Sequence, residues 1–206
     1  VPAKPVTVDL NESLSGMAGM LHALLTDRIT ERLALSPTPA FVHADQTQIE
    51  EMVMAFASNA RDAMPNGGNC TISTAVVEFA EAEAAPSPGL KPGRYVLLTV
   101  ADTGIGMDAG TLARVFEPFF TTKPTPANGG MSLATAYGNV RQTGGAISVA
   151  SAPNAGTTIS VFLPFQPAPT TGPKPPAREP PRPALPWRFR RGLLVPRPGS
   201  HPVVFS

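Results

Sequence analysis

Two polar side chains stand near the end of an otherwise apolar helical segment. Asn59 and Asp62 lie three residues apart in the stretch NARDAMPNGG, and side chains at that spacing share one face of a helix. An amide oxygen and a carboxylate on one helix face can hold a ligand jointly. Their types and spacing are compatible with a binding site at the end of this helix. The competing interpretation is that Asn59 only caps or crosses the helix end.

A second candidate group follows 43 residues after Asn59. Asp102 stands in DTGIGM, directly after the apolar run VLLTVA, and a carboxylate at a strand end can accept hydrogen bonds from an amino group. Gly104 and Gly106 follow it, where a side chain would hinder a turn and the close approach of backbone to a ligand. The motif alone is a weak signal, because Asp-Gly stretches build turns in many proteins.

The elements around these residues follow from the apolar spacing. Helical spacing predicts helices at residues 11–25, 45–64, 112–116 and 131–144. Alternating or continuous apolar runs predict strands at residues 29–36, 40–45, 69–79 and 94–104, and two more within 146–164. This order predicts an α+β fold, a two-layer sandwich of a mixed, mainly antiparallel sheet with helices on one face.

Composition divides the 206-residue chain into two parts. Residues 165–206 hold seven basic residues against one glutamate and are rich in proline, so we expect an extended, largely disordered tail. Such a tail could touch nucleic acid or anionic lipid, but a solvated linker is the preferred interpretation. Residues 1–164 are expected to fold as one domain. No apolar run is long enough to span a bilayer. The single Cys70 excludes an internal disulfide.

Five short boxes occur in a fixed order: ASNARDA, DTGIGM, VFEPFFTTK, NGGMSLATAYG and GTTISVFLP. Together they resemble the ATP-binding catalytic domain of sensor histidine kinases, within the GHKL ATPase superfamily that includes type II topoisomerases and mismatch-repair ATPases. The resemblance covers residues 9–164. It implies a Bergerat-type ATP-binding fold, ATP and Mg²⁺ as ligands, and transfer of the γ-phosphoryl group to a histidine on a separate dimerisation segment.

The resemblance also implies roles for individual residues. Asn59 would ligate Mg²⁺, Asp62 would order the waters of the metal, and Asp102 would accept the adenine amino group. Thr157 resembles the family's hydroxyl near the adenine, and Lys123 would approach the phosphates. A plain strand threonine and a solvated lysine are the competing interpretations. The resemblance assigns further nucleotide contacts to Gly104, Gly106, Gly129, Gly130, Ser132 and Leu133. Phe116 is better explained as a core aromatic.

Three positions depart from the family pattern. Ala55, one helical turn before Asn59, replaces a polar side chain, which is a general base in the hydrolytic relatives. Asn128 and Ser132 stand where glycine is usual. A Cβ at Ser132 costs about 1 kcal/mol if the backbone there must be left-handed, although its hydroxyl could instead donate to a phosphate. Binding is therefore a safer expectation than turnover.

The phosphoacceptor is expected outside this sequence. None of His22, His43 and His201 lies in the context of a dimerisation segment, so we expect the partner histidine upstream or in another protein. The resemblance further implies a response regulator receiver domain as partner and a cytoplasmic location, even if the parent chain is membrane-anchored. No nucleic acid partner and no membrane contact are expected. The alternatives are a degenerate binding module without turnover, and an ATP-hydrolysing or serine-directed relative.

Overall fold

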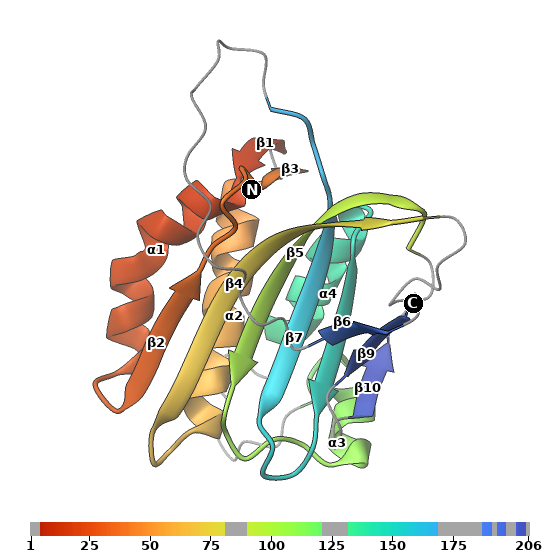
Figure 1. Ribbon diagram of the computed structural model, residues 1–206. Helices are drawn as coiled ribbons and strands as arrows, with labels where there is room; N and C mark the ends of the chain where they lie inside the picture. Colours follow the sequence, from red (N-terminus) through yellow and green to blue (C-terminus); the bar gives the residue numbers. More distant parts are fainter. Residues whose placement is uncertain are drawn as a thin grey trace.

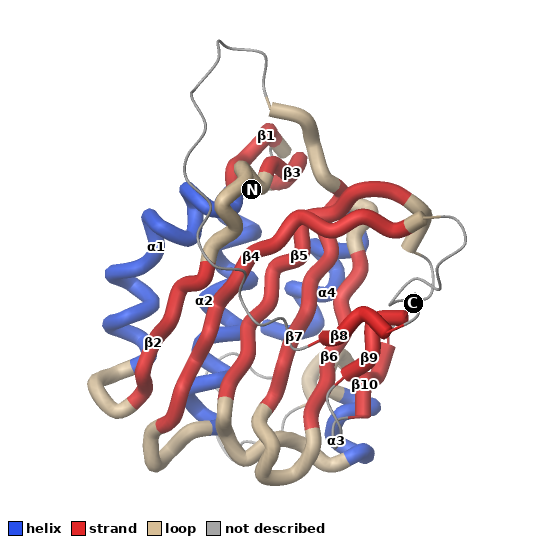
Figure 2. Tube along the Cα trace, in the orientation of Figure 1, coloured by secondary structure: helices blue, strands red, loops and turns tan. Residues whose placement is uncertain are grey.

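The structure, a computed structural model, describes residues 5–80, 90–120, 132–168, 187–190, 193–196 and 201–204. Its helices are α1 (Leu10–Leu25), α2 (Gln46–Ala63), α3 (Ala109–Arg114) and α4 (Ser132–Gln142). Its strands are β1 (Val6–Asp9), β2 (Ile29–Ala34), β3 (Phe41–Ala44), β4 (Gly68–Phe79), β5 (Gly93–Asp102), β6 (Ala146–Ser151), β7 (Thr157–Pro164), β8 (Trp187–Arg190), β9 (Leu193–Pro196) and β10 (His201–Val204). Figure 2 shows both kinds of element.

The main sheet has six strands in the order β10-β6-β7-β5-β4-β2. β2 runs parallel to β4, and all other neighbours in this sheet are antiparallel. Helices α1, α2 and α4 lie against one face of the sheet (Figure 1). The prediction of an α+β sandwich with a mixed, mainly antiparallel sheet and helices on one face is therefore confirmed. β1 pairs with β3 in a separate small sheet, and β1 was not predicted.

Helix α2 begins and ends where the sequence predicts. The Asp45 carboxylate caps its first turn by accepting hydrogen bonds from the amides of Thr47 (2.9 Å) and Gln48 (3.3 Å). The helix ends at Ala63, two residues before Pro65. One face buries six apolar side chains against the core, namely Ile49, Met52, Val53, Phe56, Ala57 and Ala60. This burial fixes the helix on the sheet and leaves its other side available for polar groups.

Strand β5 carries apolar side chains on both faces of the sheet. Val96, Leu98 and Val100 belong to the main core beneath the helices, whereas Tyr95 and Leu97 belong to a second cluster. Successive strand residues point to opposite faces. Asp102, two residues after Val100, therefore shares the face that the helices cover. The last residue of β5 thus places its carboxylate on the side of the sheet where α2 lies.

The backbone contacts of the domain continue past Pro164. The amide of Phe165 donates to the carbonyl of Arg94 (3.0 Å), and that of Gln166 donates to the carbonyl of Phe41 (2.8 Å). The Arg94 guanidinium lies 4.2 Å from the centre of the Phe165 ring. Farther on, β8 pairs with β9 and β10 pairs with β6; the sequence predicted none of these three strands. The division of the chain at residue 164 stays a prediction.

Candidate functional site

The Asp102 carboxylate is held from two sides by backbone amides. Its Oδ1 accepts hydrogen bonds from the N–H of Gly104 (2.8 Å) and the N–H of Thr157 (3.2 Å). Burial raises the pKa of this carboxyl above 3.8, and the two amide hydrogen bonds lower it in part. Among the described residues, both hydrogen bonds to this carboxylate go to Oδ1 and none goes to Oδ2. Oδ2 is therefore the atom that can accept a hydrogen bond from a ligand.

Four polar side chains form a row across the ends of four strands. Cys70, Asp102, Thr157 and Ser151 are directly opposite one another along β4, β5, β7 and β6, so their side chains share the helix-facing side of the sheet. Cys70 is buried, and burial, with the charges of Asp102 and Glu31, raises the pKa of its thiol to about 12. The thiol is therefore a neutral packing group in this row.

Thr157 is the register partner of Asp102 across β5 and β7, and its contact with an adenine stays a prediction. Its side chain is 9% exposed, and its Oγ1 lies 2.9 Å from the Oγ of Ser151. Ser151 itself was not singled out from the sequence. In the sequence, Ser151 is marked only by its place at the end of a predicted strand. Many serines without a role in binding occupy such a place.

Two glycines after Asp102 allow three backbone segments to meet. A Cβ at Gly104 would lie 2.5 Å from the carbonyl oxygen of Ala63, and a Cβ at Gly106 (φ +66°) would overlap the carbonyl of Ala152. The amide of Ile105 donates to the carbonyl of Ala63 (2.9 Å). Both positions therefore require glycine, as expected. In the structure, the atoms that come close to these glycines belong to the protein backbone. Contact of these glycines with a nucleotide stays a prediction.

Gly156 is a third such glycine, and no role was predicted for it from the sequence. It adopts φ +74°, and a Cβ there would overlap the carbonyl oxygen of Asp102. This contact lets the turn between β6 and β7 close over the end of β5. The sequence offered one signal for this role, the position of Gly156 directly before Thr157. The residue that excludes a side chain there, Asp102, lies 54 positions earlier in the chain.

Asn59 lies on α2, one helical turn before the residue that contacts the loop after Asp102. The side chain is half-buried, and it stands four residues before Ala63, whose carbonyl accepts the amide of Ile105. Residues four apart lie on one side of a helix, about 6 Å apart along its axis. The carboxamide of Asn59 therefore lies one helical turn from the hydrogen bond between α2 and the loop after Asp102.

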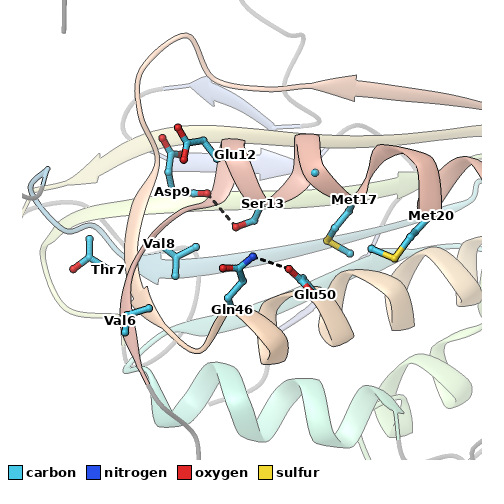
Figure 3. Close-up of a pocket in the computed structure, with 11 residues that line it drawn as sticks. Val6, Thr7, Val8, Asp9, Glu12, Ser13, Met17, Met20, Gln46 and Glu50 are labelled. Carbon is cyan, nitrogen blue, oxygen red and sulfur yellow. Dashed lines mark hydrogen bonds between the residues drawn. The ribbon is translucent and has the colours of Figure 1, made fainter.

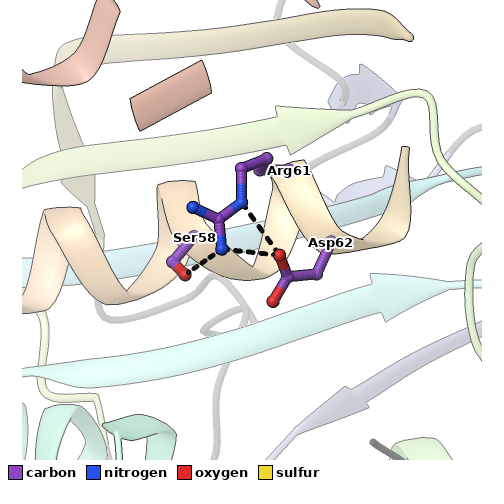
Figure 4. A network of polar contacts seen from close by, with 3 residues as sticks. All are labelled: Ser58, Arg61 and Asp62. Carbon is purple, nitrogen blue, oxygen red and sulfur yellow. Dashed lines mark hydrogen bonds and ion pairs between the residues drawn. The ribbon is translucent and has the colours of Figure 1, made fainter. Parts of the chain in front are cut away.

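Asp62 is engaged by its neighbour in the chain. Its Oδ1 accepts from Nε (2.9 Å) and Nη2 (2.8 Å) of Arg61, and Nη2 also lies 3.4 Å from the Oγ of Ser58 (Figure 4). This ion pair is partly exposed, with the two side chains 38% and 30% accessible. The arginine was not part of the predicted site. The Asp62 carboxylate is therefore one half of an ion pair in this structure, and its contact with the waters of a metal stays a prediction.

Several predicted residues lie elsewhere or outside the described chain. Lys123, Gly129, Gly130 and Asn128 lie outside the described residues. Ser132 begins α4, and Leu133 follows it, half-buried against the main core. Ala55 is half-buried on α2, one turn before Asn59.

Phe116 has the core position expected of it. It is 7% exposed and stacks on Tyr137 with ring centres 5.3 Å apart. Phe119, by contrast, is 73% exposed and adopts a φ of +66°. The phenylalanine-rich box therefore contains a buried anchor and an exposed aromatic only three residues away.

A separate cavity of about 450 Å³ lies between β1, α1 and the start of α2 (Figure 3). None of the predicted site residues lines it. Two hydrogen bonds join lining residues to one another: Ser13 Oγ donates to the carbonyl of Asp9 (3.2 Å), and Gln46 Nε2 donates to Glu50 Oε1 (2.8 Å). We assign it no role in binding.

Comparison with known proteins gives the family. Residues 44–167 match the family of histidine kinase-, DNA gyrase B- and HSP90-like ATPases. The chain belongs to this family. The matched region of this ATPase domain contains Asn59, Asp102, Thr157 and the glycines between them. The superfamily that the sequence resembles is thereby confirmed.

Two relatives of this ATPase domain are sensor proteins, and they confirm the resemblance to the catalytic domain of sensor histidine kinases. It is 37% identical to the sensor kinase CckA of Brucella abortus over 161 residues, which cover 78% of this chain and 17% of that protein. It is 33% identical to the two-component sensor PprA of Pseudomonas aeruginosa over 140 residues, 68% of this chain and 14% of that protein. The chain therefore spans less than a fifth of the length of these relatives.

Solved structures share the fold of this ATPase domain. The mycobacterial sensor histidine kinase MprB superposes with a TM-score of 0.61 at 24% identity, covering 80% of this chain and 99% of that chain. Full-length ShkA in complex with AMPPNP gives the same TM-score and identity over 80% of this chain and 32% of that one. No helix within the described residues is both long and apolar enough to cross a membrane.

Proposed function

We propose that this ATPase domain binds ATP with Mg²⁺ and acts as the catalytic domain of a two-component sensor histidine kinase. It would transfer the γ-phosphoryl group to a histidine on a separate dimerisation segment, upstream in the parent chain or in another protein. The observation that carries the proposal is the Asp102 carboxylate, with Oδ1 fixed by two amides and Oδ2 left to accept. Its relatives CckA and PprA are sensor proteins, and ShkA binds the ATP analogue AMPPNP.

Asp102 would bind the base. An ionised carboxylate only accepts hydrogen bonds, so Oδ2 pairs with the exocyclic amino group of adenine. The two amides on Oδ1 keep the carboxylate from rotating. Binding of the base then positions the rest of the nucleotide without any covalent chemistry by the domain, as expected for phosphoryl transfer governed by placement and charge.

Asn59 would act at the phosphate end. Mg²⁺, when bound, neutralises the charge of the phosphates. It prefers oxygen ligands and is commonly held by one or two protein groups together with phosphates and waters, and the carboxamide oxygen of Asn59 suits that requirement. Asp62, paired with Arg61, would orient the waters around the metal. We assign the remaining phosphate contacts to Lys123, Gly129, Gly130, Ser132 and Leu133.

The partners follow from the proposed reaction. A histidine-bearing dimerisation segment receives the phosphoryl group, and a response regulator receiver domain takes it from there. A location on the cytoplasmic side is proposed because ATP is supplied there. The domain needs no nucleic acid or lipid for this reaction.

One observation favours a second candidate, a module that binds nucleotide without turnover. Ala55 occupies the helix position one turn before Asn59 and carries no polar group. Loss of a base or a polar orienting group can cost about 10²–10⁴ in rate. The departures at Asn128 and Ser132 act in the same direction.

A labelling experiment separates these candidates. The parent chain, with its own upstream segment, is incubated with γ-labelled ATP and Mg²⁺, and the acid-labile, base-stable label expected of phosphohistidine is measured. Label on histidine supports the kinase. Binding of ATP without label, in wild type and after Ala55→Asn, would overturn the kinase assignment in favour of the binding module, and release of free phosphate alone would indicate a hydrolase.

A further inference from the structure

Ser151 is a buried hydroxyl at the centre of the adenine end of the proposed site. It is the last residue of β6 and is 3% exposed. Its Oγ lies 2.9 Å from each of three atoms: the amide nitrogen of Met107, the carbonyl oxygen of Gly156, and the Oγ1 of Thr157. It therefore joins the loop after Asp102 to the turn between β6 and β7.

Counting hydrogens fixes the direction of every bond at Ser151. A serine hydroxyl offers one hydrogen and two acceptor lone pairs. The carbonyl of Gly156 can only accept, so the Ser151 hydrogen goes there. The amide of Met107 can only donate, so it uses one lone pair of Ser151. The contact with Thr157 is then satisfied only when the Thr157 hydroxyl donates.

This direction decides what Thr157 can offer to a ligand. Its single hydrogen points at Ser151, so its Oγ1 has only lone pairs left. Thr157 lies directly opposite Asp102 across two paired strands, where neighbouring Cβ atoms are about 4.5–5.5 Å apart. The ionised Asp102 carboxylate also has only lone pairs. The two groups therefore form an edge that accepts hydrogen bonds and donates none.

We propose that Ser151 is a positioning residue that makes the base end selective for purines whose amino group lies at the edge facing Asp102 and Thr157. By holding the hydrogen of Thr157, it makes the Thr157 oxygen an acceptor beside Asp102. A base with an amino group at this edge finds two acceptors, whereas a base with a carbonyl there meets two groups that cannot donate to it. The inference rests on the proposed nucleotide-binding function and adds a specificity role for a residue that does not touch the base.

The test compares two nucleotides that differ only at this edge. Dissociation constants for ATP and ITP, which carries a carbonyl in place of the adenine amino group, are measured by titration calorimetry with Mg²⁺. The variants are Ser151→Ala and, as a matched control, Ser148→Ala. Ser148 lies on the same strand, is 2% exposed, and points to the other face of the sheet.

Ser151→Ala frees the Thr157 hydroxyl to turn its hydrogen toward a carbonyl. The ratio of ITP to ATP dissociation constants is expected to fall about tenfold, the value of one hydrogen bond gained or lost. Ser148→Ala should keep the wild-type ratio. A purely structural role for Ser151 would weaken both nucleotides equally, and an unchanged ratio would overturn the proposal.

Variants of Thr157 keep the test decisive if Ser151→Ala does not fold. Thr157→Ser retains the hydroxyl and should keep the ratio, whereas Thr157→Val removes the acceptor and should lower it. In a Thr157→Val background, Ser151→Ala should change the ratio no further. A wild-type ratio in Thr157→Val contradicts the inference. Failure of the wild type to bind either nucleotide would instead contradict the proposed function itself.

Discussion

The carboxylate of Asp102 accepts the backbone N–H of Thr157 across two neighbouring strands, with 3.2 Å between nitrogen and Oδ1. The two residues are also direct partners in the antiparallel register of β5 and β7. A residue at the end of one strand is thus oriented by the first residue of another, 55 positions later. The orientation of this carboxylate therefore depends on the pairing of β5 with β7.

Asp102→Asn should weaken the binding of a non-hydrolysable ATP analogue about 10- to 100-fold, the value of a hydrogen bond to a charged group. Because Oδ1 accepts two amides, the asparagine will place its oxygen there and its NH₂ toward the ligand. A donor would then face the amino group of adenine. Calorimetric titration measures the change. Asp27→Asn, an exposed carboxylate in the turn before β2, is the control, and equal affinities in the two variants would contradict the prediction.

Gly156→Ala should destabilise the domain and impair nucleotide binding together. Its φ of +74° disfavours a side chain, and a Cβ would overlap the carbonyl of Asp102. We expect a loss of about 1–3 kcal/mol in the free energy of unfolding, measured by urea denaturation. Gly19→Ala, on α1 with open space at its Cβ, should instead gain about 0.5–1 kcal/mol. A neutral Gly156→Ala would refute the packing argument.

Nucleotide affinity should fall as the pH is lowered through the pKa of Asp102, above the ordinary value of 3.8. Protonation takes away the acceptor that the base requires. The stability effect has the opposite sign: because the folded-state pKa is raised, this group favours folding most below pH 3.8, and that contribution is lost as pH rises through the raised pKa. Relative to Asp102→Asn, the wild type should therefore gain stability in acid while it loses affinity. Parallel pH profiles for the two proteins would disprove this.

The thiol of Cys70 should resist alkylation in the folded protein. With a pKa of about 12, it has almost no thiolate at pH 8, and the thiolate is the reactive form. Mass spectrometry after iodoacetamide treatment at pH 8 should find the native protein unmodified and the urea-unfolded protein modified once. Rapid native labelling would mean that the row of Cys70, Asp102 and Thr157 is open to solvent.

Much of this fold follows from local sequence patterns. The apolar stripe of α2 and its cap at Asp45 predict that helix nearly to the residue, and the apolar runs at residues 69–79 and 94–104 predict the strands β4 and β5. These signals are local, so a single sequence carries them. The same holds for the two strands predicted within residues 146–164, which are β6 and β7.

The remaining features depend on which segments meet in space. The clash between a Cβ at Gly104 and the carbonyl of Ala63 requires α2 to end against the loop after β5. The three bonds of Ser151 join two loops and a strand. No period or spacing encodes such contacts. The pairing of Arg61 with Asp62 was equally hidden, because adjacent residues on a helix do not ordinarily face each other.

The central claim is that Asp102 and Asn59 bind the two ends of one Mg-nucleotide. Its most direct test is the affinity for a non-hydrolysable ATP analogue, measured with Mg²⁺ and with EDTA, in the wild type, Asn59→Ala and Asp102→Asn. We predict that Asn59→Ala abolishes the gain in affinity that Mg²⁺ gives the wild type while leaving metal-free binding intact, and that Asp102→Asn weakens binding under both conditions. Full retention of the Mg²⁺-dependent gain in Asn59→Ala would contradict the account.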